Sequence, residues 1–273
     1  MISRPARAAN LARNRLAKAS RAEQWRPARD ALWTLLDRHV RPGAAVAVVG
    51  AGNAHDLPLT RLLARAGTVD LIDLSAGPSR RALRAEPADL RGRGRVLRSD
   101  VTGGAADRIV SAAVRGRAPR DVSVPRQPVG AGRYDVVVGD LFYSQLLYPA
   151  LLDAGLASHR IGAALDEHGQ TLCDAVVARL HASAELVIHV HDRLGWWDDN
   201  APPMPIEAYL AGDAELADAP GPRGCDIPGA LSRCGQRIAD RALWRWSFAD
   251  GVDYLVEALV AISVLHDETR ATP

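Results

Sequence analysis

The chain has 273 residues, of which 48% are hydrophobic and 24% are charged, so it is long and apolar enough to bury a substantial core. This composition excludes a fully disordered chain and a fibre, and a formal net charge of +2 gives no general reason to expect a nucleic-acid partner. No run approaches the roughly 18 consecutive apolar residues of a membrane span, and the arginine-rich start lacks the apolar block of a secretory signal. We therefore expect a cytoplasmic protein without a membrane partner.

Residues 1–41 form a basic N-terminal extension, with ten basic side chains against three acidic ones. Apolar residues recur at helical spacing in its second half, which predicts an amphipathic helix packed on the rest of the protein. These residues are Trp25, Leu32, Leu35, Leu36 and Val40. A solvated basic face explains the charge most simply, with an RNA-binding arm or a lid over a site as alternatives.

Four short apolar runs follow, and each has Gly or Asp as its last or next-to-last residue. They cover residues 44–50, 68–74, 94–100 and 134–140. Such runs predict strands that are buried on both faces of a parallel sheet. Helix-compatible segments separate them, near residues 56–67, 78–90 and 103–116. This alternation predicts a doubly wound α/β domain.

The second half of the chain continues the α/β pattern and then changes it. Helical patterns at about 143–157 and 161–183 precede a fifth strand at 185–192. Two final apolar segments, 241–248 and 254–265, flank the turn-forming sequence ADGVD and predict a β-hairpin.

Between the fifth strand and the hairpin, residues 195–230 are rich in Pro, Gly and Asp. We expect a long irregular connection with a short helix near 206–217, since loops of this length often serve as lids. Trp196 and Trp197 in it either stack on a planar acceptor or anchor the connection to the core. Cys173, Cys225 and Cys234 fit neither a disulfide framework nor a Cys-x-x-Cys zinc site, so we expect structural thiols.

The segment VAVVGAGNAHDLPL, residues 46–59, is a strand followed by a glycine-rich turn and a helix. Glycine at positions 50 and 52 permits a tight turn and lets backbone N–H groups approach a ligand closely. The next strand ends in Asp73, 21 residues after Gly52, where a carboxylate can accept two hydrogen bonds from a ribose diol. The third strand ends in Asp100, which is placed to meet an adenine amino group.

With these features the chain resembles the class I S-adenosylmethionine-dependent methyltransferases, which share a Rossmann-like sheet. The matching positions are Gly50 and Gly52, the ribose-binding acid Asp73 with Leu74, the adenine contact Asp100-Val101, and VVVGDLFY at 136–143. The resemblance covers roughly 44–192 and 238–266. It implies a mostly parallel seven-stranded sheet that ends in an antiparallel hairpin, and S-adenosylmethionine as cofactor. It also implies that residues 42–273 form a catalytic domain with 195–230 as a lid or insert, after the extension at 1–41.

Two positions depart from the family pattern. Val48 replaces the acid usual near the end of the first strand, and Ala54 replaces the third glycine. Because that acid accepts a hydrogen bond from the methionine ammonium in the family, Asn53, Asp56 or Asp140 has to take its place.

The catalytic candidates follow the fourth and fifth strands. Ligands lie beyond the carboxyl ends of strands in such sheets, so Asp140 and Tyr143 should border the reacting methyl group, unless Asp140 is a helix N-cap. Neighbouring strands should bring Asp140 near His191 and Asp192, with His191 as a general base. Alternatively His191, Asp192 and Asp140 bind a metal, or His191 is structural; we expect no metal site.

The sequence therefore predicts methyl transfer to an O or N atom of a small-molecule or peptide acceptor, as in specialised metabolism. Other chemistry with the same cofactor, such as aminopropyl transfer or assisted cyclisation, is an alternative, and RNA methylation is another. Beyond residue 41 the chain has 24 basic and 29 acidic residues, which does not favour nucleic acid. A homodimer is compatible with the sequence.

Overall fold

The computed structural model describes residues 20–216 and 225–263, together with residues 5, 8, 9 and 12. Seven strands form one sheet in the order β3-β2-β1-β4-β5-β7-β6. The strands are β1 Ala45–Val49, β2 Thr68–Asp73, β3 Gly94–Arg98, β4 Tyr134–Asp140, β5 Ala184–Trp196, β6 Gln236–Ala249 and β7 Val252–Ser263. β1 to β5 pair in parallel, whereas β7 runs antiparallel to both β5 and β6. The predicted fold class, a mostly parallel sheet with an antiparallel C-terminal hairpin, is confirmed.

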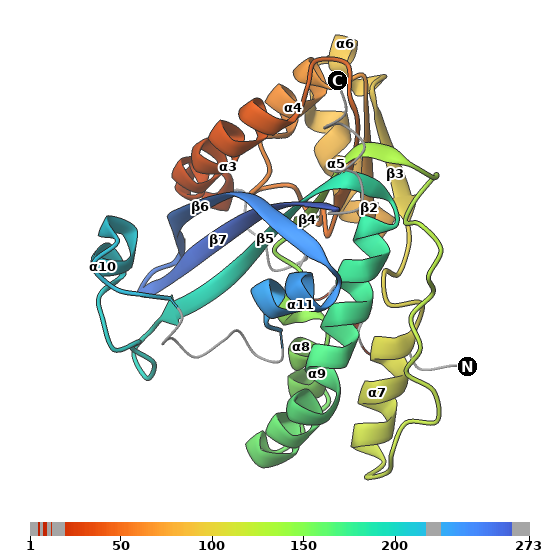
Figure 1. Cartoon of the computed structure of the whole chain (residues 1–273), viewed down its shortest axis with the longest axis vertical. Helices are drawn as coiled ribbons and strands as arrows, with labels where there is room; N and C mark the ends of the chain where they lie inside the picture. The colour runs from red at the N-terminus through yellow and green to blue at the C-terminus, as the bar shows by residue number, and fades with distance from the viewer. Residues whose placement is uncertain (1–4, 6–7, 10–11, 13–19, 217–224, 264–273) are drawn as a thin grey trace, which may run out of the picture.

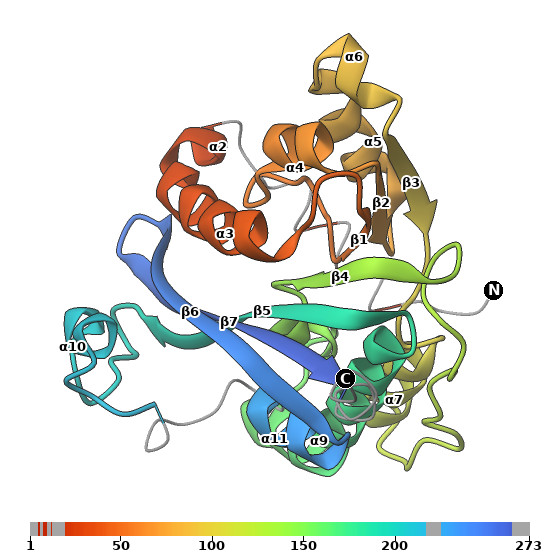
Figure 2. The same ribbon diagram turned by 45° about the horizontal axis from the view of Figure 1, so that its top comes forward.

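Helices cover both faces of the sheet (Figure 1, Figure 2). The helices of the first half are α2 Ser20–Gln24, α3 Arg26–His39, α4 Leu59–Arg65, α5 Ala76–Ala85, α6 Ala88–Arg91 and α7 Ala105–Val114. Those of the second half are the 3-10 turn η1 Tyr143–Gln145, α8 Tyr148–Asp153, α9 Ser158–His181, α10 Ile206–Ala211 and α11 Ile227–Arg233. Side chains of α3 and α4 pack in one core cluster, and those of α7, α8, α9 and α11 pack in the other.

The central strands are buried on both faces because their side chains alternate between these two cores. In β1, Val46 and Val48 face the core under α3, whereas Ala47 and Val49 face the core under α9. Each of these four side chains is at most 1% exposed. The predicted strands do not alternate polar and apolar residues because both faces of the sheet are covered.

The predicted amphipathic helix of the N-terminal extension is α3. Leu32, Leu35 and Leu36 are at most 2% exposed and pack in the same cluster as Val48 and Trp246. Burying three leucines stabilises the docked helix by about 5 kcal/mol or more before entropy is counted. Trp25 precedes the helix, and its indole N–H donates to the carbonyl of Phe248 at 3.1 Å. This contact attaches the start of α3 to the hairpin.

Several boundaries differ from the predictions for local reasons. The single helix expected at 78–90 is two helices, because Pro87 occupies the N-cap of α6. The helix expected at 206–217 ends at Ala211, where Gly212 adopts a left-handed conformation, and residue 217 lies outside the described residues. Helix α11 was not predicted at all, although Asp226 caps it by accepting from the amide of Gly229 at 3.1 Å.

The hairpin agrees with the prediction up to Ser263, and the two further residues expected in it lie outside the described part of the chain. Within the described residues, every helix is too short or too polar to span a membrane. The carboxyl ends of β1, β2 and β4 meet at one edge of the sheet, where the loops that carry the predicted site residues begin.

Candidate functional site

The glycine loop begins where β1 ends and is fixed by backbone contacts. The amide of Gly50 donates to the carbonyl of Ile72 at 2.9 Å. The hydroxyl of Ser79 in α5 donates to the carbonyl of Gly52 at 3.0 Å. Gly50 has a φ of +87°, and a Cβ on it would lie 2.7 Å from the carbonyl oxygen of Asp140. Position 50 therefore requires glycine, and the loop passes close to the end of β4.

Asp73 ends β2 directly beside this loop. Its carboxylate accepts a hydrogen bond from the amide of Gly52 at 3.1 Å and another from the amide of Ser75 at 2.8 Å. Burial raises the pKa of Asp73, and the two amide bonds offset only part of that rise. A carboxylate offers about four acceptor positions, so about two remain for a ligand. Asn53 and Leu74, the other predicted contacts here, are half-buried.

Asp100 follows β3 and organises the turn into α7. Its carboxylate accepts from the amide and hydroxyl of Thr102 at 2.8 and 2.7 Å and from the amide of Gly104 at 2.7 Å. The carbonyl of Val101 accepts from the guanidinium of Arg179 at 2.7 Å. These bonds hold the turn in place, and the adenine contact proposed for this pair stays a prediction.

Asp56 and Asp140 line a small cavity of about 10 Å³ between α3, the end of β4 and the middle of β5. The remaining walls are apolar or aromatic: Ala28, Leu32, Leu141, Val190, Trp244 and Trp246. Asp140 is 2% exposed, and within the described part of the chain neither carboxylate oxygen has a hydrogen-bond partner. The N-cap alternative for Asp140 is therefore wrong in this structure, because an N-cap carboxylate accepts a backbone N–H.

The electrostatics of this pair are unusual. Burial, together with the nearby charge of Asp56, raises the pKa of Asp140 well above its ordinary range. Burial also raises the pKa of Asp56 to about 6, despite the opposing effects of backbone amides and Arg29. The indole N–H of Trp246, which belongs to the cavity wall, also has no partner among the described residues. The cavity is thus a polar site in which hydrogen-bonding groups remain unsatisfied.

Backbone strain is concentrated beside the same pair. Ala54 and Leu141 have positive φ values of 54° and 48°, and they are the two non-glycine residues with this feature in the described chain. Ala54 ends the glycine loop, and Leu141 directly follows Asp140. Left-handed conformations of such residues cost on the order of 1–3 kcal/mol and cluster at functional sites.

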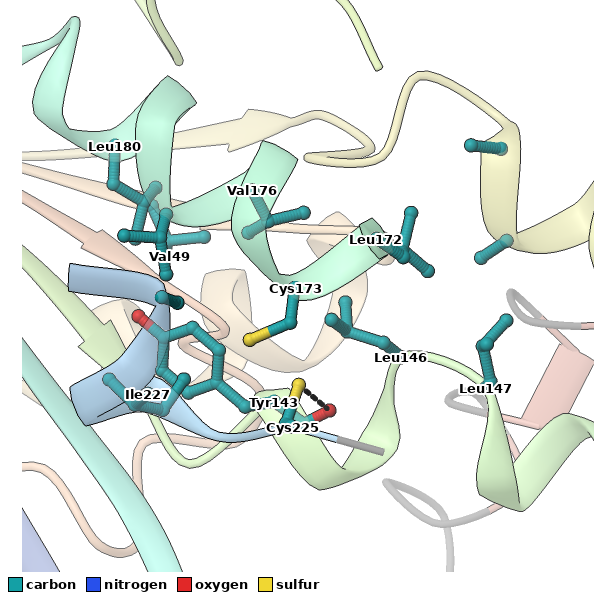
Figure 3. Packing of buried hydrophobic residues seen from close by; sticks show 14 of the residues in the cluster. Val49, Tyr143, Leu146, Leu147, Leu172, Cys173, Val176, Leu180, Cys225 and Ile227 are labelled. Atoms are coloured by element: carbon teal, nitrogen blue, oxygen red, sulfur yellow. Dashed lines mark hydrogen bonds between the residues drawn. The ribbon is translucent and has the colours of Figure 1, made fainter. Parts of the chain in front are cut away.

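The structure does not place Tyr143 at this site. Its side chain is 1% exposed, packs in the core under α9, and its hydroxyl lies 2.6 Å from Nδ1 of His189. Figure 3 shows the ring among apolar side chains, with Cys225 directed at the Tyr143 carbonyl oxygen 3.7 Å away. The prediction that Tyr143 borders a reacting group is wrong here, because η1 turns the side chain back beneath β4.

The expected proximity of Asp140 and His191 is also wrong, although β4 and β5 are neighbours as predicted. Asp140 is in register with Val190, and both line the cavity, so their side chains share one face of the sheet. His191 is the next residue and points to the opposite face. There its Nε2 lies 3.3 Å from the carboxylate of Glu257, with both side chains 1% exposed.

Asp192 is half-buried at an irregularity where β5 shifts its register against β7. Across the described ranges, no three His, Cys, Asp or Glu residues lie close enough together to bind a metal. The alternative in which His191, Asp192 and Asp140 form a metal site is therefore not supported by their positions. A general-base role for His191 stays a prediction, with Glu257 as the partner that sequence reasoning missed.

Glu257 and the tryptophans of β6 were not predicted as neighbours of the site. The sequence offers one signal for Glu257, a single charge within the apolar segment YLVEALVAISVL. Trp244 and Trp246 are buried and form a wall of the cavity. Their position becomes clear only once the hairpin is placed beside α3.

The aromatic pair in the long connection anchors it to the rest of the protein. Trp196 contacts Tyr209 of α10 edge-on, with ring centroids 6.0 Å apart. The ring of Trp197 lies 6.2 Å from that of Tyr254 in β7. These contacts favour the anchoring interpretation over stacking on an acceptor.

No protein-family model matches the chain, and no curated protein matches it in sequence. Solved structures to which it is similar include a proposed RNA methyltransferase from Pyrococcus horikoshii, with 14% identity over 91% of this chain and 92% of that one, and a TM-score of 0.49. Magnesium protoporphyrin IX methyltransferase from Synechocystis, with bound S-adenosylhomocysteine, is 15% identical over 89% and 83% of the two chains, with a TM-score of 0.44.

A S-adenosylmethionine-dependent methyltransferase from Aquifex aeolicus is 15% identical over 92% of this chain and 96% of its own, with a TM-score of 0.43. At these levels of similarity, none of the three assigns an activity or an acceptor to this chain.

Proposed function

We propose that this chain binds S-adenosylmethionine at the carboxyl ends of β1, β2 and β3 and transfers its methyl group to an O or N atom of a small-molecule or peptide acceptor. The observation that carries the proposal is the buried carboxylate of Asp73, held against the amide of Gly52. This geometry matches the ribose-binding acid and glycine loop that the resemblance predicts, and it leaves acceptor positions for a diol.

The residues present fit this cofactor. Gly50 keeps the loop free of a side chain beside β4. Asp100 and Val101, which follow β3, are the residues that we propose contact the adenine. The cofactor supplies a methyl group that is activated by a sulfonium charge. The chain contributes binding and orientation, which alone account for a large part of the acceleration of such a transfer.

Helix α3 forms one wall of the cavity beside the proposed site. The guanidinium of Arg29 donates to the carbonyl of His55 at 2.6 Å, which attaches α3 to the segment after the glycine loop. Leu32 and Ala28 of the same helix line the cavity beside Asp140. We propose that this helix and residues 195–216 of the long connection together cover the acceptor.

A small acceptor is favoured over RNA by the contacts of the basic extension. Arg26 pairs with Glu23 in its own segment. Arg38 pairs with Asp240 of β6 at 3.2 Å, and the Arg21 guanidinium lies 5.1 Å from the ring centroid of Phe248. These side chains contact the protein itself, which supports a docking role for the extension.

The test is isothermal titration calorimetry with S-adenosylmethionine and S-adenosylhomocysteine. We expect micromolar binding, and Asp73→Ala should weaken it at least tenfold, about 1.4 kcal/mol. Asp89→Ala, which removes an exposed acid from α6, is the matched control and should leave the affinity unchanged. Folded wild-type protein that binds neither compound would contradict the proposal.

An acceptor screen with detection of S-adenosylhomocysteine as product then separates methyl transfer from other chemistry. Aminopropyl transfer would release methylthioadenosine, and assisted cyclisation would consume no cofactor. Formation of S-adenosylhomocysteine that depends on an added acceptor is the result expected here.

A further inference from the structure

Charge is distributed unevenly along the chain beyond the N-terminal extension. Residues 80–133 contain 13 arginines and five acidic residues. The rest of the chain beyond residue 41 contains 11 basic and 24 acidic residues. The small net charge of the whole chain therefore conceals a strongly basic part within an acidic body.

The fold leaves most of these arginines unpaired. Nine of them are exposed, and their guanidinium groups make no ion pair or hydrogen bond with any described residue. The nine are Arg80, Arg81, Arg84, Arg98, Arg115, Arg117, Arg120, Arg126 and Arg133. Arginines elsewhere on the surface pair with acids, as Arg61 does with Asp30 and Arg233 with Asp174, each at 2.8 Å. The nine charges, which we call the basic edge, are thus not used by the fold itself.

Four arginines of the basic edge lie on β3 and on the helix beside it. In the described sheet, β3 is the outermost strand on one side. Arg98 is its last residue. Helix α5, which carries three more of the nine arginines, packs on one face of this strand, with Leu83 against Gly94.

The other five arginines lie in residues 115–133, between α7 and β4. This segment crosses the opposite face of the outer strands, because Gly130 lies against Ile72 of β2, whose side chain packs in the core on the α7 side. Figures 1 and 2 show the segment on the β3 side of the molecule. The basic edge therefore flanks the outermost strand on both faces.

Protection of the outermost strand explains only a small part of this charge. Charged side chains on such a strand prevent it from pairing with another chain, which accounts for Arg95 and Arg98. The arginines of α5 and of residues 115–133 lie outside the strand. Like charges gathered on one surface repel each other, and a bound polyanion would remove this repulsion.

The residue types at the basic edge favour nucleic acid over an acidic protein. Protein interfaces have an apolar core and are enriched in aromatic residues. Residues 80–133 contain no Phe, Trp or Tyr, and Val114 is the one exposed large hydrophobic residue in this fully described range. Guanidinium groups bind phosphate through two parallel hydrogen bonds, and a phosphate backbone repeats that target along its length.

The same composition favours a duplex over a single strand. Proteins bind single strands largely by stacking the bases on aromatic rings, which this surface lacks. A duplex instead presents its phosphates on the outside, where contacts carry no sequence information. We propose that the basic edge binds the phosphate backbone of a nucleic-acid duplex, whatever its sequence. This inference goes beyond the proposed function, because it assigns a partner on which the chain docks and not the acceptor of the methyl group.

The experiment measures the affinity of the whole chain for RNA and DNA duplexes of about 20 base pairs by fluorescence anisotropy, between about 50 and 200 mM salt. The edge variant combines Arg84→Gln, Arg98→Gln and Arg126→Gln, one from each part of the basic edge. The control variant combines Arg26→Gln, Arg38→Gln and Arg61→Gln, which removes the same charge from exposed arginines that pair with acids. No cofactor is added, so the result does not depend on the proposed function.

We expect the wild type to bind at least one duplex with an affinity that falls steeply as the salt concentration rises. The edge variant should bind about tenfold more weakly at low salt, and its slope of log affinity against log salt should be smaller by about 2–3. The control variant should keep both the affinity and the slope of the wild type. Binding of only one duplex type would identify RNA or DNA as the source of the phosphates and would equally support the site.

Three results would overturn the proposal. The first is folded wild-type protein that binds neither duplex. The second is an equal loss in the edge and control variants, which would show a response to net charge alone. The third is tighter binding of poly-glutamate or of a single strand than of both duplexes. Thermal unfolding checks that the variants are folded, and the three edge substitutions made singly replace the triple variant if it is not.

Discussion

Two buried carboxylates lie on opposite faces of the sheet, and their surroundings differ completely. Glu257 of β7 and Asp140 of β4 are 1% and 2% exposed. Glu257 faces basic side chains: the Nη2 of Arg241 lies 2.5 Å from it, the Nε2 of His191 3.3 Å, and the Nε of Arg193 3.8 Å. Asp140 faces another carboxylate.

The pKa values of the two groups move in opposite directions for this reason. Burial would raise the pKa of Glu257, but its ion pairs with His191, Arg241 and Arg193 outweigh burial and lower it. Burial raises the pKa of Asp140 and nothing opposes it. The fold thus supplies basic partners to Glu257 and supplies none to Asp140 among the described residues.

The same isosteric change at both positions gives the sharpest comparison. Glu257→Gln removes the buried negative charge that pairs with Arg193 and Arg241, and we expect it to destabilise the protein by about 3 kcal/mol. Urea unfolding measures this value. Glu207→Gln is the control, because its pair with Arg245 is largely exposed and should change stability by less than about 1 kcal/mol. A Glu257 variant as stable as the wild type would show that the ion pairs of Glu257 do not stabilise the fold.

Asp140→Asn should change the free energy of unfolding in the opposite direction and stabilise the protein. Near neutral pH the aspartate is ionised in the unfolded chain but must take up a proton or bury its charge on folding. The neutral amide of Asn avoids this cost and can donate a hydrogen bond to Asp56, so we expect stabilisation by about 1–2 kcal/mol. The same urea titration measures it. Stabilisation combined with weaker binding of S-adenosylhomocysteine would identify Asp140 as a functional residue. Destabilisation comparable to that of Glu257→Gln would instead show an unrecognised structural partner.

Sequence reasoning located the strands and the glycine loop because their signals are local. The apolar runs of β1 and β4 are continuous since both faces of each strand are buried. The spacing of Gly52 and Asp73 is likewise a local property of one β-α-β unit, and the structure joins the two residues by a hydrogen bond that was not predicted.

The catalytic assignments failed where the answer depended on register and side-chain direction. The neighbouring position of β4 and β5 was predicted, but the pairing of Asp140 with Val190 was not, and a shift of one residue exchanges the two faces. Tyr143 is turned inward by the strained Leu141 and the following 3-10 turn. The partners of Glu257 come from β5 and β6, whose alignment no short-range pattern records.

The pH dependence of stability separates the two acids again. A raised pKa in the folded state means that the folded protein binds more protons than the unfolded chain, so stability falls as pH rises. The decline begins at the ordinary pKa of an aspartate. It extends to about pH 6 for Asp56 and to a higher pH for Asp140. Each such group contributes at most about 1.4 kcal/mol per pH unit. Asp140→Asn should flatten this decline, relative to wild type, in urea titrations over that window.

Charged neighbours of the pair must be held constant in that comparison. Arg29 of α3 acts on both Asp56 and His55, and burial lowers the pKa of His55. Both residues are present in the wild type and in the variant, so the difference between the two curves isolates Asp140. For Glu257 the sign reverses, because stability from its lowered pKa is lost as pH falls below its ordinary range. Identical curves for wild type and Asp140→Asn would refute the raised pKa.

Tyr143→Phe should have the smallest effect and tests where the functional site ends. The hydroxyl shares a hydrogen bond with His189 inside the core, so its removal should cost about 1 kcal/mol of stability in urea unfolding. Because the ring points away from the cavity of Asp140, affinity for S-adenosylhomocysteine should not change. A tenfold loss of affinity for S-adenosylhomocysteine without loss of stability would show that Tyr143 does contribute to the site. The two faces of the sheet would then be coupled at the end of β4.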